Sequence, residues 1–140
     1  MGVDRHTDLV HIIDFGLSKE FRNPKTHAHI LYKKDLAFTG TAIFISINSH
    51  LGLELRRWDD LESLAYTLFF FLWGFLPWQG LENNDMLKCK QAIFTSNLFH
   101  KLLQEFCTFL EHCRLLPFDG KPNYNHFFAL FNNLLLRDAL

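Results

Sequence analysis

The sequence predicts a mainly α-helical fold with one short β-strand near its N-terminus. Three long stretches, residues 59–73, 98–113 and 125–136, are rich in apolar residues, which recur at helical spacing in the last two. Residues 10–13 are rich in β-branched side chains and predict the strand. Hydrophobic residues make up 49% of the 140-residue chain and charged residues only 21%, so the chain is not disordered as a whole.

The predicted strand is followed by the triplet Asp14-Phe15-Gly16. Gly16 permits a sharp turn, so the strand would deliver the Asp14 carboxylate at its end. Protein kinases use Asp-Phe-Gly to hold magnesium over the ATP phosphates, with the Asp on the metal and the Phe packed beneath. Three letters alone more often mark a tight turn, and that is the alternative interpretation of Asp14 in the isolated chain.

The stretch from Asp14 to residue 30 resembles the start of the activation segment in the casein kinase 1 family of serine/threonine protein kinases. Further blocks follow in that family's order: Thr-Gly-Thr-Ala at 39–42, Ser-Ile-Asn-Ser-His-Leu-Gly at 46–52, Asp-Asp-Leu-Glu-Ser-Leu at 59–64, Leu-Pro-Trp-Gln-Gly at 76–80 and a closing block at 113–124. The Ser-Ile-Asn triplet stands where most other kinases carry Ala-Pro-Glu. The resemblance covers essentially all 140 residues.

This resemblance implies a truncated C-terminal lobe of the protein-kinase-like α+β fold. Residues 1–140 would be one partial kinase domain, with an activation segment at 14–54 and C-terminal-lobe helices within 59–140. The first six residues are similar to a stretch that follows the catalytic loop in the family. We therefore expect the chain to begin inside a kinase domain, without an N-terminal lobe or a catalytic loop.

The middle of the chain is expected to be irregular up to its first long helix. Residues 21–45 lose periodicity and predict a loop, and residues 46–58 predict a loop with a short helix. The long helix is expected to start at Asp59, which can form a capping box with Glu62, and to end near residue 73 at Gly74. Its apolar residues lie on nearly every face, which predicts that it needs protein all round it.

Three further helices are expected, at 83–94, 98–113 and 125–136. In the second of these, apolar residues at helical spacing form one stripe, for which core packing is the preferred interpretation. In the family, the carboxylate at the start of the long helix, here Asp60, hydrogen-bonds the backbone of the catalytic loop.

The resemblance also implies site residues. Asp14, with Phe15 and Gly16, would bind Mg-ATP through magnesium, and Thr41 would sit against the catalytic Asp. For Thr41 the alternative is a simple loop hydroxyl. The sequence contains no G-x-G-x-x-G motif, no strand lysine with its helix glutamate and no catalytic Asp and Asn. Because these groups stabilise one transition state together, we expect this chain alone to bind no nucleotide and to have no activity.

The family reads acidic or phosphorylated substrates with a basic cluster, and this sequence departs from it. Ile43 and Trp58 stand at two basic positions, which exchanges charge for apolar surface. Cys89 stands near a third, although Lys88 and Lys90 flank it and can substitute.

Composition limits the partners and the compartment. A formal net charge of −1 argues against nucleic acid and an anionic membrane surface as partners. The longest apolar run, 64–76, is shorter than the roughly twenty residues of a membrane span.

Three cysteines without C-x-x-C spacing predict reduced thiols in the cytoplasm or nucleus. A zinc site that borrowed His27, His29 or His112 is disfavoured, because the spacings fit no metal-site pattern.

Three functions remain open at this point. The preferred one is a catalytically incompetent fragment of a casein kinase 1-like kinase, whose complete relatives act on protein substrates. The alternative is a non-catalytic, pseudokinase-like interaction module that binds a protein partner through the apolar face of the long helix. A third keeps activity by completion with another chain. In each case we expect marginal stability without a partner.

Overall fold

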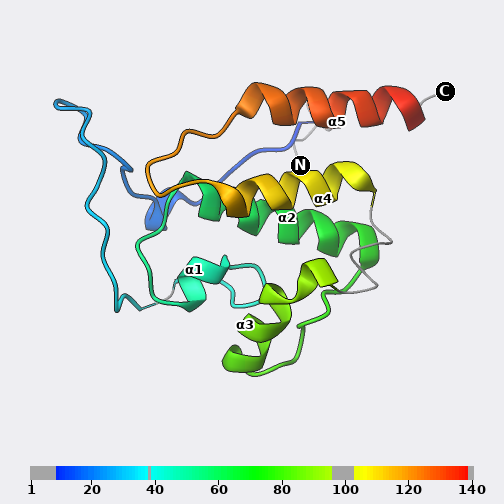
Figure 1. The fold of residues 1–140 in the computed structure, drawn as a ribbon, viewed down its shortest axis with the longest axis horizontal. Coiled ribbons are helices and arrows are strands. Elements are labelled where there is room, and N and C mark those ends of the chain that lie inside the picture. The colour runs from blue at the N-terminus through cyan, green and yellow to red at the C-terminus, as the bar shows by residue number, and fades with distance from the viewer. Residues whose placement is uncertain (1–8, 38, 96–102, 139–140) are drawn as a thin grey trace. The chain divides into compact units, whose positions relative to one another are not determined.

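The computed structural model describes residues 9–37, 39–95 and 103–138 (Figure 1). The chain divides into two units, Met1–Ile30 and Leu31–Leu140. Among the described residues, regular structure is mainly helical, as the sequence predicts. No described helix is both long enough and apolar enough to cross a membrane.

The first unit contains no strand at residues 10–13, so that prediction is wrong for the described chain. Val10, Ile12 and Ile13 are 82%, 81% and 79% exposed. A strand needs a neighbouring strand to take its backbone hydrogen bonds, and β-branched composition cannot supply one. The turn after it is confirmed: a short 3-10 helix, η2 (Phe15–Leu17), follows Asp14.

The rest of the first unit is a loop closed by local hydrogen bonds. The Asn23 side-chain oxygen accepts from the backbone N–H groups of Lys25 and Thr26 at 2.8 and 3.0 Å. The Asn23 N–H donates to the Ala28 carbonyl at 2.8 Å, and a single antiparallel bridge joins Arg22 to His29. Asparagine favours such turns because its side chain imitates a backbone carbonyl. The irregular loop predicted here is therefore confirmed.

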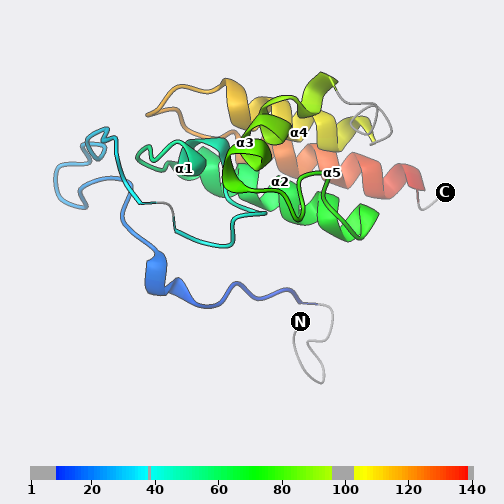
Figure 2. The same cartoon turned by 90° about the horizontal axis from the view of Figure 1, so that it is seen from below.

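The second unit is built from five α-helices within its described part: α1 (Ile47–His50), α2 (Arg57–Trp73), α3 (Asn83–Gln91), α4 (Gln104–Leu115) and α5 (Tyr124–Asp138). A 3-10 turn, η3 (Ile93–Thr95), follows α3. Helix α2 packs against α4, α4 against α5, and α1 contacts both α2 and α3. Figures 1 and 2 show α2, α4 and α5 running side by side, with the short α1 beside the start of α2.

Helix α2 begins two residues earlier than predicted, at Arg57. Asp59 does take part in a capping box, but from inside the first turn: its Oδ2 accepts from the Arg56 N–H at 2.9 Å. Glu62 is buried and does not cap the helix. The predicted end is confirmed, because Gly74 has a φ of 75° and its N–H donates to the Phe70 carbonyl at 2.8 Å.

The remaining helices are confirmed with shifted ends. Helix α3 stops at Gln91, and the last residues of its predicted range belong to η3. Helix α4 begins at Gln104, and residues 98–102 of its predicted range lie outside the described residues. Helix α5 is slightly longer than predicted, and α1 is the short helix expected in 46–58.

Aromatic side chains form much of the core of the second unit. The rings of Tyr66 and Trp78 meet edge-on at 4.8 Å between centroids, and those of Phe109 and Phe127 at 4.9 Å. Such pairs add to the stabilisation from apolar burial. Trp58 is only 1% exposed, and its Nε1 donates to the Gly120 carbonyl at 3.0 Å. The interpretation of Trp58 as apolar surface is therefore wrong.

One face of α2 remains apolar and uncovered within the described second unit. Its members are Leu64, Phe71 and Leu72 of α2 and Phe75, which follows the Gly74 C-cap; they are 46%, 74%, 50% and 49% exposed. Phe71 and Leu72 lie seven and eight residues after Leu64, which places these three on one side of the helix. We call this set the α2 face.

Candidate functional site

The residues predicted to hold Mg-ATP lie in the first unit, in a turn. Asp14 has a φ of 62°, and its Oδ1 accepts from the Gly16 N–H at 3.4 Å. Phe15 is 67% exposed, so it does not pack beneath the carboxylate as the resemblance implied. No group of three or more His, Cys, Asp or Glu side chains that could hold a metal occurs in the described chain. In proteins, magnesium is often bound by one or two carboxylates together with water and the phosphates of a substrate. Asp14 would therefore hold the metal only together with those other ligands.

Thr41 lies in the second unit, in the turn before α1. Its carbonyl accepts from the N–H groups of Phe44 and Ile45 at 2.8 and 3.2 Å. Its side chain lines a cavity of about 260 Å³ formed by residues 39–46, α1 and the first two turns of α2. We call this space the α1–α2 cavity. Of the described residues that line it, Asp59 and Asp60 carry charge and none is basic.

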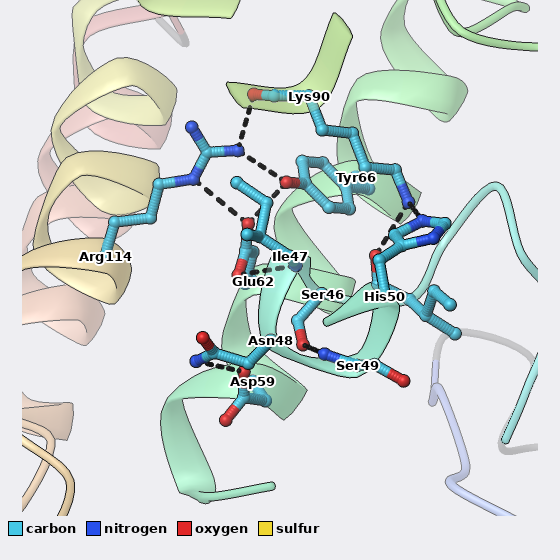
Figure 3. Close-up of polar contacts among 11 residues, drawn as sticks. Ser46, Ile47, Asn48, Ser49, His50, Asp59, Glu62, Tyr66, Lys90 and Arg114 are labelled. Carbon is cyan, nitrogen blue, oxygen red and sulfur yellow. Dashed lines mark hydrogen bonds and ion pairs between the residues drawn. The ribbon is translucent and has the colours of Figure 1, made fainter. Parts of the chain in front are cut away.

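Each residue of the Ser-Ile-Asn triplet fixes α1 in place (Figure 3). The Ser46 hydroxyl caps α1 by accepting from the Ser49 N–H at 3.1 Å. The Ile47 N–H donates to Glu62 at 3.4 Å, and the Asn48 side chain donates to Asp59 Oδ1 at 2.9 Å. The triplet thus ties α1 to the first turns of α2 through two carboxylates.

A buried ion pair joins α2 to α4. Arg114 Nε lies 3.0 Å from Glu62 Oε1, and its Nη2 donates to the Tyr66 hydroxyl at 2.6 Å and to the Lys90 carbonyl at 3.0 Å (Figure 3). Tyr66 in turn donates to Glu62. Burial, followed by the nearby Glu62 charge, raises the pKa of Tyr66 well above its ordinary value. The planar fork of arginine suits a site in which three acceptors converge.

Lys90 is fully buried, with 0% exposure. Its Nζ donates to the carbonyls of Ala42 and Ile45 at 2.9 and 2.7 Å and lies 3.0 Å from His50 Nε2. Desolvation lowers the pKa of Lys90 to about 7. The prediction that Lys90 can bind an acidic substrate is wrong, because its head group holds the loop before α1. Lys88 is exposed and pairs with Asp85 at 2.9 Å.

The other two positions of the expected basic cluster are also occupied by packed residues. Ile43 is partly buried against the core, and its carbonyl accepts from Trp78 Nε1 at 2.7 Å. Cys89 is half-buried, and burial raises the pKa of its thiol. All three cysteines are free thiols.

Sequence reasoning missed one polar group that burial leaves unsatisfied, the Ser49 hydroxyl. Ser49 is 3% exposed, and its Oγ has no hydrogen-bond partner in the described chain. Asp60, to which the resemblance assigns a hydrogen bond with the catalytic loop, also lines the cavity; it is exposed and makes no hydrogen bond or ion pair with a described residue, and partial desolvation raises the pKa of its carboxyl. No sequence pattern signals the Ser49 hydroxyl, because its burial depends on how α1 and α2 approach each other.

A search against protein-family models finds no match to this chain.

Proposed function

We propose that the chain is a fragment of a casein kinase 1-like serine/threonine protein kinase that corresponds to the activation segment and C-terminal lobe, and that it is catalytically inactive by itself. One observation carries this proposal: blocks far apart in the sequence, but in the family's order, bond to one another. The Ser-Ile-Asn triplet reaches Asp59 and Glu62, and Glu62 reaches Arg114.

Inactivity follows from what the sequence contains. Phosphoryl transfer needs a glycine-rich cover, a strand lysine with its glutamate, and a catalytic Asp and Asn, and the sequence has none of these motifs. In a complete family member, Asp14 would bind magnesium, and Thr41 would lie against the catalytic Asp.

Calorimetry with Mg-ATP tests the absence of a nucleotide site. Titration of millimolar Mg-ATP into the purified chain is expected to give only dilution heat, and Asp14→Ala should behave identically. Saturable heat that Asp14→Ala abolishes would contradict inactivity and reveal a surviving phosphate site.

A chimaera tests the kinase assignment itself. The segment from the Asp-Phe-Gly aspartate onward of a complete casein kinase 1 family enzyme would be replaced by residues 14–138. The chimaera is expected to phosphorylate a peptide substrate with magnesium dependence, and Asp14→Ala should abolish transfer. A chimaera that folds and binds ATP, but transfers no phosphate even after Ile43→Arg restores a basic position, would overturn the assignment.

The second candidate function is a non-catalytic protein-interaction module. The α2 face favours it, since an exposed apolar stripe of this kind marks partner sites. A partner that covers this face would protect Phe71 from solvent. The free cysteines fit a reducing compartment, the cytoplasm or the nucleus, for either function.

A further inference from the structure

The α1–α2 cavity has an apolar wall and a polar side. Phe44, Ile45 and Leu55 contribute the apolar wall, while Ser49 and Asp60 contribute polar groups that make no hydrogen bond in the described chain. The shape therefore suits a group with an apolar stem and a hydrogen-bonding head.

The Ser49 hydroxyl is the first sign that something is bound there. Ser49 is 3% exposed, and its backbone N–H is already used by Ser46, but its Oγ has no partner in the described chain. Buried hydroxyls in folded proteins are almost always hydrogen-bonded, because a buried hydroxyl without a partner loses its hydrogen bonds to water and gains none in return. A ligand that brings a donor or acceptor into the cavity would satisfy it.

Asp60 specifies the charge of that ligand. Its neighbour Asp59 is satisfied by the Asn48 side chain and the Arg56 N–H, and the Arg56 Nε lies 3.4 Å away. Asp60 lines the same cavity, is exposed, and has no such contact with a described residue. A positively charged donor that entered the cavity would pair with this carboxylate through a charge-assisted hydrogen bond.

We propose that the α1–α2 cavity binds the side chain of an arginine presented by a peptide partner. The guanidinium would donate to Asp60 and Ser49, and the aliphatic stem would lie along Phe44 and Ile45. A phosphate or other anion is disfavoured by the two carboxylates in the lining. A metal ion is disfavoured because the described chain offers no cluster of three ligands. Arginine is preferred over lysine because its fork reaches two acceptors at once.

This inference goes beyond the proposed function and does not rest on the kinase resemblance. It assigns to the α1–α2 cavity a recognition role that is independent of ATP. The chain would keep this role whether or not it belongs to a phosphotransferase.

The experiment is a titration of the chain with acetyl-Ala-Arg-Ala-amide, followed by NMR shifts or calorimetry. Its matched probe replaces arginine with citrulline, which has the same shape without the charge. The arginine peptide is expected to bind about tenfold or more tightly than the citrulline peptide, because a hydrogen bond to a charged group is stronger than a neutral one. A lysine peptide should fall between them.

Asp60→Asn serves as the binding variant, because Asp60 lies on the exposed side of α2 and the substitution keeps its shape. It is expected to remove the preference for arginine over citrulline, whereas Asp85→Asn, on α3 outside the cavity lining, should retain it. Equal binding of the two peptides by the original chain, or an unchanged preference in Asp60→Asn, would overturn the proposal. Neither result depends on Mg-ATP, so failure here is distinguishable from failure of the kinase assignment.

Discussion

Lys90 illustrates at the residue scale how a buried charge organises this molecule. The Lys90 Nζ bonds two carbonyls of the loop before α1 and touches His50 Nε2, so one side chain of α3 holds both that loop and α1. A neutral amine still has two N–H groups for the two carbonyls. The contacts therefore survive deprotonation, which burial promotes.

Lys90 makes the stability of the chain depend on pH. Its pKa is lowered from 10.5 to about 7 on folding, so between these values the unfolded chain binds one proton more than the folded chain. The free energy of unfolding therefore rises as pH increases through about 7, with a limiting slope of about 1.4 kcal/mol per pH unit. Lys90→Met lacks this contribution. We expect the stability difference between original and variant to grow by about 1.6 kcal/mol from roughly pH 7 to 8.5, measured by urea unfolding.

The comparison with Lys90→Met is needed because other groups titrate nearby. Burial raises the pKa values of the cysteine thiols, to about 12 for Cys113, which lowers stability as pH rises above their unfolded pKa. The original chain and Lys90→Met both contain these thiols, so the contribution of the thiols to the free energy of unfolding cancels in the difference. The pKa of His50 is lowered by burial and then by Lys90, and it titrates below the chosen window. A pH-independent difference would show that Lys90 keeps its proton in the folded state.

Residues such as Lys90 and Trp58 lie beyond what the sequence could predict. Both were assigned by position in the family to a charged or exposed surface, yet they are 0% and 1% exposed. Their burial depends on partners distant in the chain, such as Ala42 for Lys90 and Gly120 for Trp58. Asp59 was predicted more successfully, because capping depends on residues three positions apart.

At the scale of elements, local signals located the helices and failed for the strand. The end of α2 was predicted from Gly74 because a left-handed C-cap needs only that residue. The strand at 10–13 could not be predicted reliably, because pairing is a property of two segments. The α1–α2 cavity was missed for the same reason: it exists only where two helices and a loop meet.

Gly74 offers a test of the α2 terminus at this scale. A Cβ at Gly74 would meet no atom within 4 Å, so any cost of Gly74→Ala comes from its φ of 75°. We expect Gly74→Ala to lower the free energy of unfolding by about 1–2 kcal/mol, as for other residues forced into the left-handed region. Asparagine tolerates that region, so Gly74→Asn should cost clearly less. Urea unfolding of both variants measures the effect, and equal costs for Ala and Asn would point to a steric cause instead.

At the scale of the whole molecule, the second unit has a well-packed side and an uncovered one. Helix α2 buries Tyr66 and Phe69 fully against its neighbours, while the α2 face remains open. Between Leu64 and Phe75 the helix carries no charged residue that would keep this side in water. The sequence predicts that α2 needs protein all round it, and within the described second unit that protein lies on one side only.

An uncovered apolar face should make the isolated chain self-associate. Phe71 is 74% exposed, so Phe71→Glu should change the free energy of unfolding by no more than about 0.5 kcal/mol, as for other surface substitutions. It should nevertheless shift the chain from oligomers towards a monomer in sedimentation velocity, because a charge in the stripe is costly to bury in a contact. Gln91→Glu, at an exposed position on α3, controls for the same change of one unit in net charge. If both variants sediment as the original chain does, the α2 face does not drive association, and the interaction-module alternative loses the observation that favours it.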